Sequence, residues 1–318
     1  MTTRANPILV GVIAGLAAAV LVAGSVYVPL FAQVMAIIVL FIAGLGFGRV
    51  AGLVAVATTA IALGIATSSA IDTVLLGLML LPAAVMSQLA TLARPASEIG
   101  GPETSLAWYP LSDVLFAGAV LTALATIVLL SLQPLDQRYS LVVDEVSRMM
   151  AEANPDVVLT ADAKAEVVRM LKTFGPISQG VGNMLMLFAG FYFAMRILTT
   201  LGRNVRPRED IRSSLRMNRM SIAFFLGGVL LMLAGGQLAI VGASFVGAMA
   251  GGFLLSGYAI LHEFVREKSW SLPALGLVYL LTVVFPPLMI IIAIAGGLAN
   301  PRRAVAITPV NPNPSNPT

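Results

Sequence analysis

The sequence predicts an all-α protein, a polytopic bundle of about eight or nine transmembrane helices with an amphipathic helical hairpin outside the membrane. Two features of the composition indicate this fold class: hydrophobic residues make up 58% of the 318 residues, and charged residues only 11%. A typical soluble domain carries about a quarter charged residues. A soluble fold could not bury so much apolar surface, and a disordered chain would not carry it. The composition therefore excludes both of these classes.

A membrane-spanning helix needs about 20 mainly apolar residues. Nine stretches meet this requirement: 8–27, 30–48, 50–69, 73–93, 111–133, 179–200, 220–240, 243–262 and 273–297. The first is interpreted as a retained span rather than a signal peptide, because further spans follow it immediately. The last is interrupted by Pro286 and Pro287. If this stretch is re-entrant, or if one earlier stretch does not cross, the count falls from nine to eight.

The same pattern divides the chain into regions. Residues 1–133 are predicted to form a five-span bundle, residues 177–300 the C-terminal spans, and residues 301–318 a disordered tail, because its end is rich in proline and asparagine. Residues 134–176 carry seven acidic and five basic side chains, and an Asn-Pro pair divides them into two stretches with apolar stripes. These stretches predict an amphipathic helical hairpin that rests on the bilayer surface or on the bundle.

The orientation in the membrane is predicted from one basic loop, residues 201–219. Its arginines include Arg203, Arg206, Arg208, Arg212 and Arg216. Short loops this basic stay in the cytoplasm, so the N-terminus is expected inside and the hairpin outside, in a bacterial inner membrane. Such cations orient the protein in the bilayer, and no nucleic-acid partner is predicted. The side of the C-terminus stays open, because nine spans would leave Arg302 and Arg303 outside.

Catalytic signatures are not found in the sequence. It has no P-loop, no cysteine for thiolate catalysis and a single histidine, His262, so no metal or cofactor site is predicted. Ser256 lies six residues before His262, which directs the two side chains to different faces of one helix. Asp72 and Asp113 each follow a serine in a predicted first helical turn, where capping explains them. The sequence therefore predicts a protein that is not an enzyme.

Placing a polar side chain against lipid costs free energy, so the polar side chains inside the predicted spans should face the bundle interior. They either form interhelical hydrogen bonds or line a ligand pocket, and the candidates for a pocket wall are Gln88, Asn183 and Gln237. Small residues at four-residue spacing permit close helix contact. The candidates for such contacts are Ala14, Ala18, Gly44, Gly48 and Gly52.

Three short motifs carry a family resemblance: Gly257–His262 at the end of one span, Trp108-Tyr109-Pro110 before another, and Gly297-Leu298-Ala299-Asn300 at the close of the last. They resemble the YybS-like family of bacterial membrane proteins, which has no established activity. This family tends to have Asp where the present chain has Asn300. It is grouped loosely with the substrate-binding subunits of energy-coupling-factor transporters. That grouping implies a bundle without its own nucleotide site, whose first helix meets a partner through small residues, here Ala14 and Ala18.

Two functional hypotheses follow. The first is a transporter-like subunit that binds a solute or lipid and depends on a separate ATPase module for energy. The second is a non-catalytic scaffold for an envelope-associated complex, with the basic loop 201–219 and the hairpin 134–176 as its contact surfaces. The substrate, the partner and the oligomeric state are not predicted by either.

Overall fold

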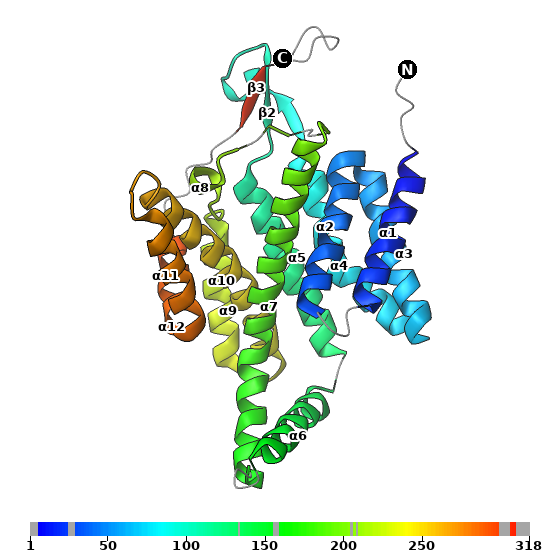
Figure 1. The fold of residues 1–318 in the computed structure, drawn as a ribbon, viewed down its shortest axis with the longest axis vertical. Helices are drawn as coiled ribbons and strands as arrows, with labels where there is room; N and C mark the ends of the chain where they lie inside the picture. Colours follow the sequence, from blue (N-terminus) through cyan, green and yellow to red (C-terminus); the bar gives the residue numbers. More distant parts are fainter. Residues whose placement is uncertain are drawn as a thin grey trace. The chain divides into compact units, whose positions relative to one another are not determined.

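The computed structural model of the protein describes residues 6–24, 29–132, 134–154, 159–203, 206–207, 209–298 and 306–309. These residues contain twelve α-helices, one short 3-10 helix and three short strands (Figure 1). The helices are α1 (Pro7–Ala23), α2 (Pro29–Phe47), α3 (Arg49–Thr67), α4 (Ala70–Ala90), α5 (Leu111–Ser131), α6 (Leu135–Ala153), α7 (Ala161–Thr200), α8 (Ile211–Ser214), α9 (Met220–Ala234), α10 (Gly236–Phe264), α11 (Ser271–Val284) and α12 (Pro287–Leu298). The all-α fold class is confirmed.

Among the described residues, six helices are long and apolar enough to cross a membrane, or seven if α11 and α12 form one bent span, fewer than the nine apolar stretches predicted. Where they are described, these stretches are mainly helical, but 220–240 is broken at Gly235, 273–297 is broken at Phe285 and Pro286, and 73–93 ends in a strand that begins at Ala93. The apolar helices α1 and α9 have only 17 and 15 residues. Helix α9 ends early because Gly235 and Gly236 follow it with positive φ, a backbone conformation that ends a helix.

The chain divides into two compact units. The first comprises residues 1–118, 185–219 and 252–318, and the second comprises residues 119–184 and 220–251. The first unit holds the N-terminal bundle of α1 to α4. Its centre is a cluster of mostly small buried residues from all four helices: Ala18, Ala36, Leu40, Ala43, Ala55, Val56 and Ala84. Small side chains let the helix backbones approach closely, so that van der Waals contact can hold them together in lipid.

The closest contacts in this bundle are made by glycines. An added Cβ on Gly15 would lie 2.6 Å from the Ala55 carbonyl oxygen, so α1 lies directly against α3. Buried Thr59 reinforces the contact, because its hydroxyl donates a 3.0 Å hydrogen bond to the Gly15 carbonyl. Gly44 and Gly52 face one another across the hairpin of α2 and α3. Gly48 lies between these two helices with a φ of 91°, and nothing lies within 4 Å of its Cβ position.

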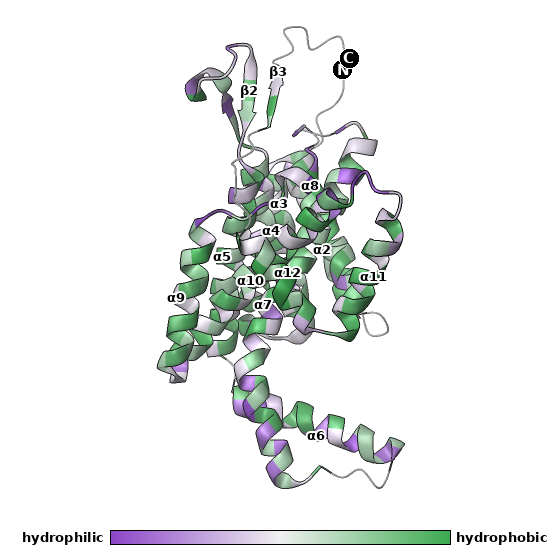
Figure 2. Cartoon of the chain, turned by 90° about the vertical axis from the view of Figure 1, so that its left-hand side faces the viewer, coloured by the Kyte–Doolittle hydropathy of each residue, from purple (hydrophilic) through white to green (hydrophobic). Residues whose placement is uncertain are grey.

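In the second unit, α6 lies beside the first half of α7. Ion pairs join the two helices at Lys164–Asp144, with a nitrogen–oxygen distance of 2.9 Å, and at Lys172–Asp136. Helix α7 has 40 residues and is about 60 Å long at 1.5 Å per residue. The predicted boundary after residue 176 therefore falls inside one continuous helix, which passes through Pro176. Figure 2 shows polar and apolar residues mixed along α6, unlike the mainly apolar α10 and α12.

The C-terminal helices α11 and α12 meet at a bend of 119°, so the chain turns back on itself at Phe285 and Pro286. Strand β3 (Ile307–Pro309) follows and pairs antiparallel with β2 (Ser105–Trp108), which pairs antiparallel with β1 (Ala93–Pro95). The predicted tail is thus not disordered throughout. The pairing brings residues 307–309 beside the connection between α4 and α5, within the first unit.

Candidate functional site

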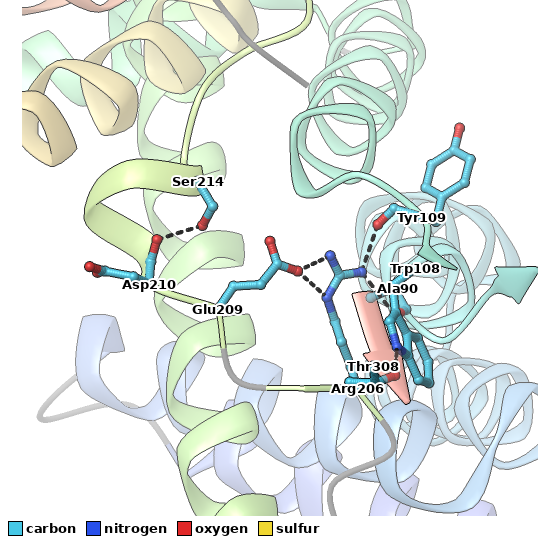
Figure 3. Close-up of polar contacts among 8 residues, drawn as sticks. All are labelled: Ala90, Trp108, Tyr109, Arg206, Glu209, Asp210, Ser214 and Thr308. Carbon is cyan, nitrogen blue, oxygen red and sulfur yellow. Dashed lines mark hydrogen bonds and ion pairs between the residues drawn. The ribbon is translucent and has the colours of Figure 1, made fainter. Parts of the chain in front are cut away.

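The most densely connected polar residues of the first unit surround Arg206, in the loop between α7 and α9 (Figure 3). Its guanidinium donates to the carbonyl oxygens of Ala90, at 3.2 Å, and Tyr109, at 2.7 Å. It also pairs with Glu209, whose Oε1 accepts from the Arg206 Nε at 2.8 Å. The Arg206 side chain is only 3% exposed and that of Glu209 12%. The buried Arg206 guanidinium, paired with Glu209 inside the loop, therefore ties this loop to the end of α4 and to the residues just before α5.

The short sheet adds a second connection around Trp108. The Trp108 backbone N–H donates to the Ala306 carbonyl at 3.0 Å, and its indole N–H donates to the Thr308 hydroxyl at 2.8 Å. Trp108 is 8% exposed. An indole N–H in a buried position needs such a partner, because an unsatisfied donor is costly. Figure 3 shows Trp108 and Thr308 next to the Arg206 contacts. Segments from three distant parts of the sequence meet here.

A second group of charges connects the same loop to the end of α10. Arg266 pairs with Asp210 at 3.1 Å and lies 3.5 Å from Glu263. The Arg216 guanidinium donates to the Arg212 and Leu215 carbonyls. Burial lowers the pKa of Arg216, and the nearby carboxylate of Glu263 opposes this shift. An arginine remains protonated at neutral pH, so this group keeps its positive charge.

The carboxylate of Asp113 has a partner in the loop as well. Asp113 lies in the first turn of α5, and the Asn218 side-chain amide donates to it. Asp72 occupies the first turn of α4, where its backbone N–H donates to the Ser69 hydroxyl at 3.1 Å. The predicted cap at Ser69 is therefore present. Asp113 differs from the prediction, because it also fixes a segment 105 residues further along the chain.

The predicted basic contact loop is mostly folded back onto the protein. Arg206 is buried, so its interpretation as a partner contact is wrong: its bonds are used inside the chain. Arg203 is exposed, and its guanidinium carbon lies 4.9 Å from the centre of the Phe47 ring. Arg212 is exposed, Arg216 is half-buried, and Arg208 lies outside the described residues. Among the described arginines of the predicted set, Arg203 and Arg212 remain accessible.

The three predicted pocket residues belong to two units, and the pocket stays a prediction. Gln88 is half-buried in the last turn of α4, in the first unit, and Asn183 is half-buried in α7, in the second. Gln237 is exposed in the first turn of α10. Among the described residues, no group of three or more histidine, aspartate or glutamate side chains is arranged to hold a metal ion. The contacts described above join separate segments of the first unit.

The predicted helix-contact residues occupy the interior of the N-terminal bundle. Ala18 is fully buried and Ala14 packs against the same cluster. Both side chains therefore pack within their own bundle, although Ala14 is only partly buried. The partner role implied by the family resemblance stays a prediction. Gly44 and Gly52 touch each other, whereas Gly48 lies in the turn between α2 and α3, where a side chain would have no neighbour within 4 Å of its Cβ.

Three residues of the site, Glu209, Trp108 and Thr308, were not among the predicted site residues. The spacing of Arg206 and Glu209, three positions apart, is compatible with a local ion pair and could have indicated it. Trp108 and Thr308 are 200 residues apart. No local pattern in the sequence signals that pairing.

The fold and this site define a multi-pass helical membrane protein in which several loops of the first unit are bound to one another. A comparison with protein families agrees. The family described as "Predicted membrane protein (DUF2232)" matches residues 16–298, and because this match covers most of the chain, the protein belongs to that family. No curated protein and no solved structure matches the chain.

Proposed function

We propose that this protein is a non-catalytic scaffold of a bacterial inner membrane, and that α6 with the first half of α7 is its contact surface. The observation that carries the proposal is a set of exposed apolar side chains that recur at three- or four-residue spacing along one face of each of these two helices. We call them the hairpin stripe: Val142, Val146, Met149, Val167, Met170 and Phe174. Exposed apolar patches of this kind mark interaction sites.

The length of α7 supports a protein partner rather than lipid. The hydrocarbon core of a bilayer is about 30 Å thick, whereas α7 extends for about 60 Å. About half of the helix therefore projects beyond the core. The projecting half carries Val167 and Met170, and lipid chains alone would not cover them.

The charges beside the stripe also favour a protein partner. Arg148 pairs with Glu145, Arg169 with Glu166 and Lys164 with Asp144. Helices that lie on a membrane surface typically present unpaired lysine and arginine to anionic lipids. Here the cations are neutralised within the helix pair. A partner with an apolar surface of its own fits this arrangement better than a lipid surface.

The orientation is part of the proposal. The basic loop 201–219 favours the cytoplasm, and its bonds to Ala90 and Tyr109 put the connection between α4 and α5 on the same side. The pairing of β2 with β3 adds the C-terminus to that side. Helices α11 and α12 meet at a bend of 119°, and we propose that they form a re-entrant pair. If the shorter apolar helices α1 and α9 are counted as crossings in addition to the six long ones, the chain crosses the membrane eight times, with the N-terminus, Arg302 and Arg303 inside.

The proposal is tested by changing the hairpin stripe in the full chain. Replacing Val146, Met149 and Met170 by serine is expected to remove at least one protein that co-purifies from native membranes in mild detergent, because the apolar contact area is lost. The readout is quantitative mass spectrometry of the purified complex. Leu141→Ser is the matched control. Leu141 is 62% exposed and lies about 100° around α6 from Val142. Identical sets of co-purifying proteins for both variants would contradict the scaffold.

A transporter-like subunit is the second candidate. Gln88 and Asn183 support it, because both are half-buried in apolar helices, and so does the resemblance to energy-coupling-factor subunits. In this case Gln88→Ala and Asn183→Ala should each reduce the amount of a bound solute or lipid at least tenfold, measured by mass spectrometry of the purified protein and its ATPase partner. The exposed Gln237 serves as the control position. Unchanged small-molecule content in all three variants would count against a binding subunit.

A further inference from the structure

The ends of three candidate spans come together in the first unit. Helix α2 ends at Phe47, α3 begins at Arg49 and α7 ends at Thr200. The end of α7 lies directly against the end of α2, because a Cβ added to Gly46 would lie 2.6 Å from the Leu198 side chain. The ends of membrane spans lie at the level of the lipid headgroups. Side chains at these ends can therefore reach the headgroups.

The turn that closes α7 gives Arg203 a fixed position. Gly202 has a φ of 65°, and its N–H donates to the Thr199 carbonyl at 3.1 Å. The Arg203 N–H donates to the Leu198 carbonyl at 2.9 Å. These two bonds form a Schellman motif, a common way for a helix to end at a glycine. The motif folds Arg203 back beside Leu198, the residue that touches the end of α2.

The guanidinium of Arg203 is held on an aromatic ring. Its central carbon lies 4.9 Å from the centre of the Phe47 ring, within the range of a cation–π contact. Arg203 is exposed, and its side chain has no ion pair or hydrogen bond within the part of the chain that the structure describes. Arg206 and Arg266, by contrast, are paired with carboxylates. Arg203 is therefore a positioned cation whose N–H donors can serve an acceptor from outside the chain.

A second cation and several apolar side chains lie close by in the chain. Arg49 is exposed two residues after Phe47, and it too has no ion pair among the described residues. Apolar neighbours on either side are also exposed: Val50 by 42%, Leu53 by 47% and Leu201 by 63%. A guanidinium donates two parallel hydrogen bonds to a phosphate, and basic sites at the ends of spans bind anionic headgroups. Exposed apolar side chains beside them suit the acyl chains of the same molecule.

We propose that Arg203, held on the Phe47 ring, binds the headgroup phosphate of an anionic phospholipid together with Arg49. The occupant is a lipid rather than a free anion, because the two cations lie at span ends and adjoin exposed apolar side chains. This inference goes beyond the scaffold and the transporter-like subunit and depends on neither. It holds for either orientation in the membrane, since it needs only the span ends.

The test uses the full chain, purified in mild detergent, stripped of lipid and titrated with phosphatidylglycerol in mixed micelles. Native mass spectrometry measures the bound lipid. Arg203→Gln should weaken the binding about tenfold, the change expected when a charged group loses its hydrogen bonds to a phosphate. Phe47→Leu keeps every charge and should weaken it about threefold, because the guanidinium is no longer held by a ring. Zwitterionic phosphatidylcholine should bind weakly to all variants and respond to neither change.

Arg212→Gln is the matched control, because it removes the same charge from another exposed arginine of the loop. Phosphatidylglycerol affinity should then stay within about twofold, since separated surface charges are screened. Equal losses for Arg203→Gln and Arg212→Gln would reduce the binding to general surface charge and overturn the site. Unchanged affinity in both Arg203→Gln and Phe47→Leu would overturn it as well. Displacement of the lipid by inorganic phosphate would identify a free-anion site and overturn the assignment to a lipid.

Discussion

Replacing Gly296 by alanine is expected to dislodge α12 from α10. A Cβ at this position would lie 1.9 Å from the Phe253 carbonyl oxygen and 2.5 Å from the Gly257 backbone nitrogen. Both atoms belong to the α10 backbone and cannot move aside independently. Overpacking in a close contact costs about 1–3 kcal/mol or more, which we expect as a lowered thermal midpoint of the purified protein in detergent.

The neighbouring glycine is a matched control for this prediction. An added Cβ on Gly297 would meet only the Phe253 ring, at 3.5 Å or more, an ordinary contact. Gly297→Ala should therefore be neutral, or stabilise the protein by up to about 1 kcal/mol, because alanine favours a helix more than glycine does. Equal midpoints for Gly296→Ala and Gly297→Ala would contradict the close approach of α12 and α10.

Arg206→Ala is expected to cause the second large loss of stability. The change leaves the Glu209 carboxylate, 12% exposed, without its counterion, and the carbonyls of Ala90 and Tyr109 without a donor. Breaking a buried ion pair by removing one partner costs about 3–5 kcal/mol. The measurement is thermal or denaturant unfolding in detergent. Arg206→Lys should restore only part of the stability that Arg206→Ala loses, because one ammonium cannot reproduce the several donors of a guanidinium.

Arg212→Ala is the control within the same loop. Arg212 is exposed, and its side chain has no ion pair among the described residues. Surface substitutions of this kind change the free energy of unfolding by no more than about 0.5 kcal/mol. If Arg206→Ala is equally mild, the buried pair with Glu209 does not form in the membrane. A further check is Glu209→Gln. Since the two residues interact, this change should lower the free energy of unfolding less in the Arg206→Ala protein than in the unmodified protein.

Local features of this protein were readable from its sequence because their causes are local. The predicted apolar stretches are mainly helical where they are described, since the backbone groups of a segment in lipid must be satisfied within that segment. Ser69 caps α4 as predicted. The sequence did not predict that α7 continues through Pro176. This proline lies where a charged stretch gives way to an apolar one, and a proline at such a place is equally compatible with the end of a helix. The tertiary structure continues the helix through this position.

The positions that matter most for the site depended on partners far away in the chain. Arg206 is part of an exposed basic loop by composition, and only its bonds to Tyr109 and Ala90, 97 and 116 residues away, make it internal. Ala14 and Ala18 look the same in sequence whether they face a partner or their own bundle. The sequence by itself determined the helical membrane fold, because hydrophobic length and helix capping act over a few turns. Only the tertiary structure decided which surfaces remain free and where the chain ends, because those depend on long-range contacts such as Trp108 with Thr308, which leave no local pattern.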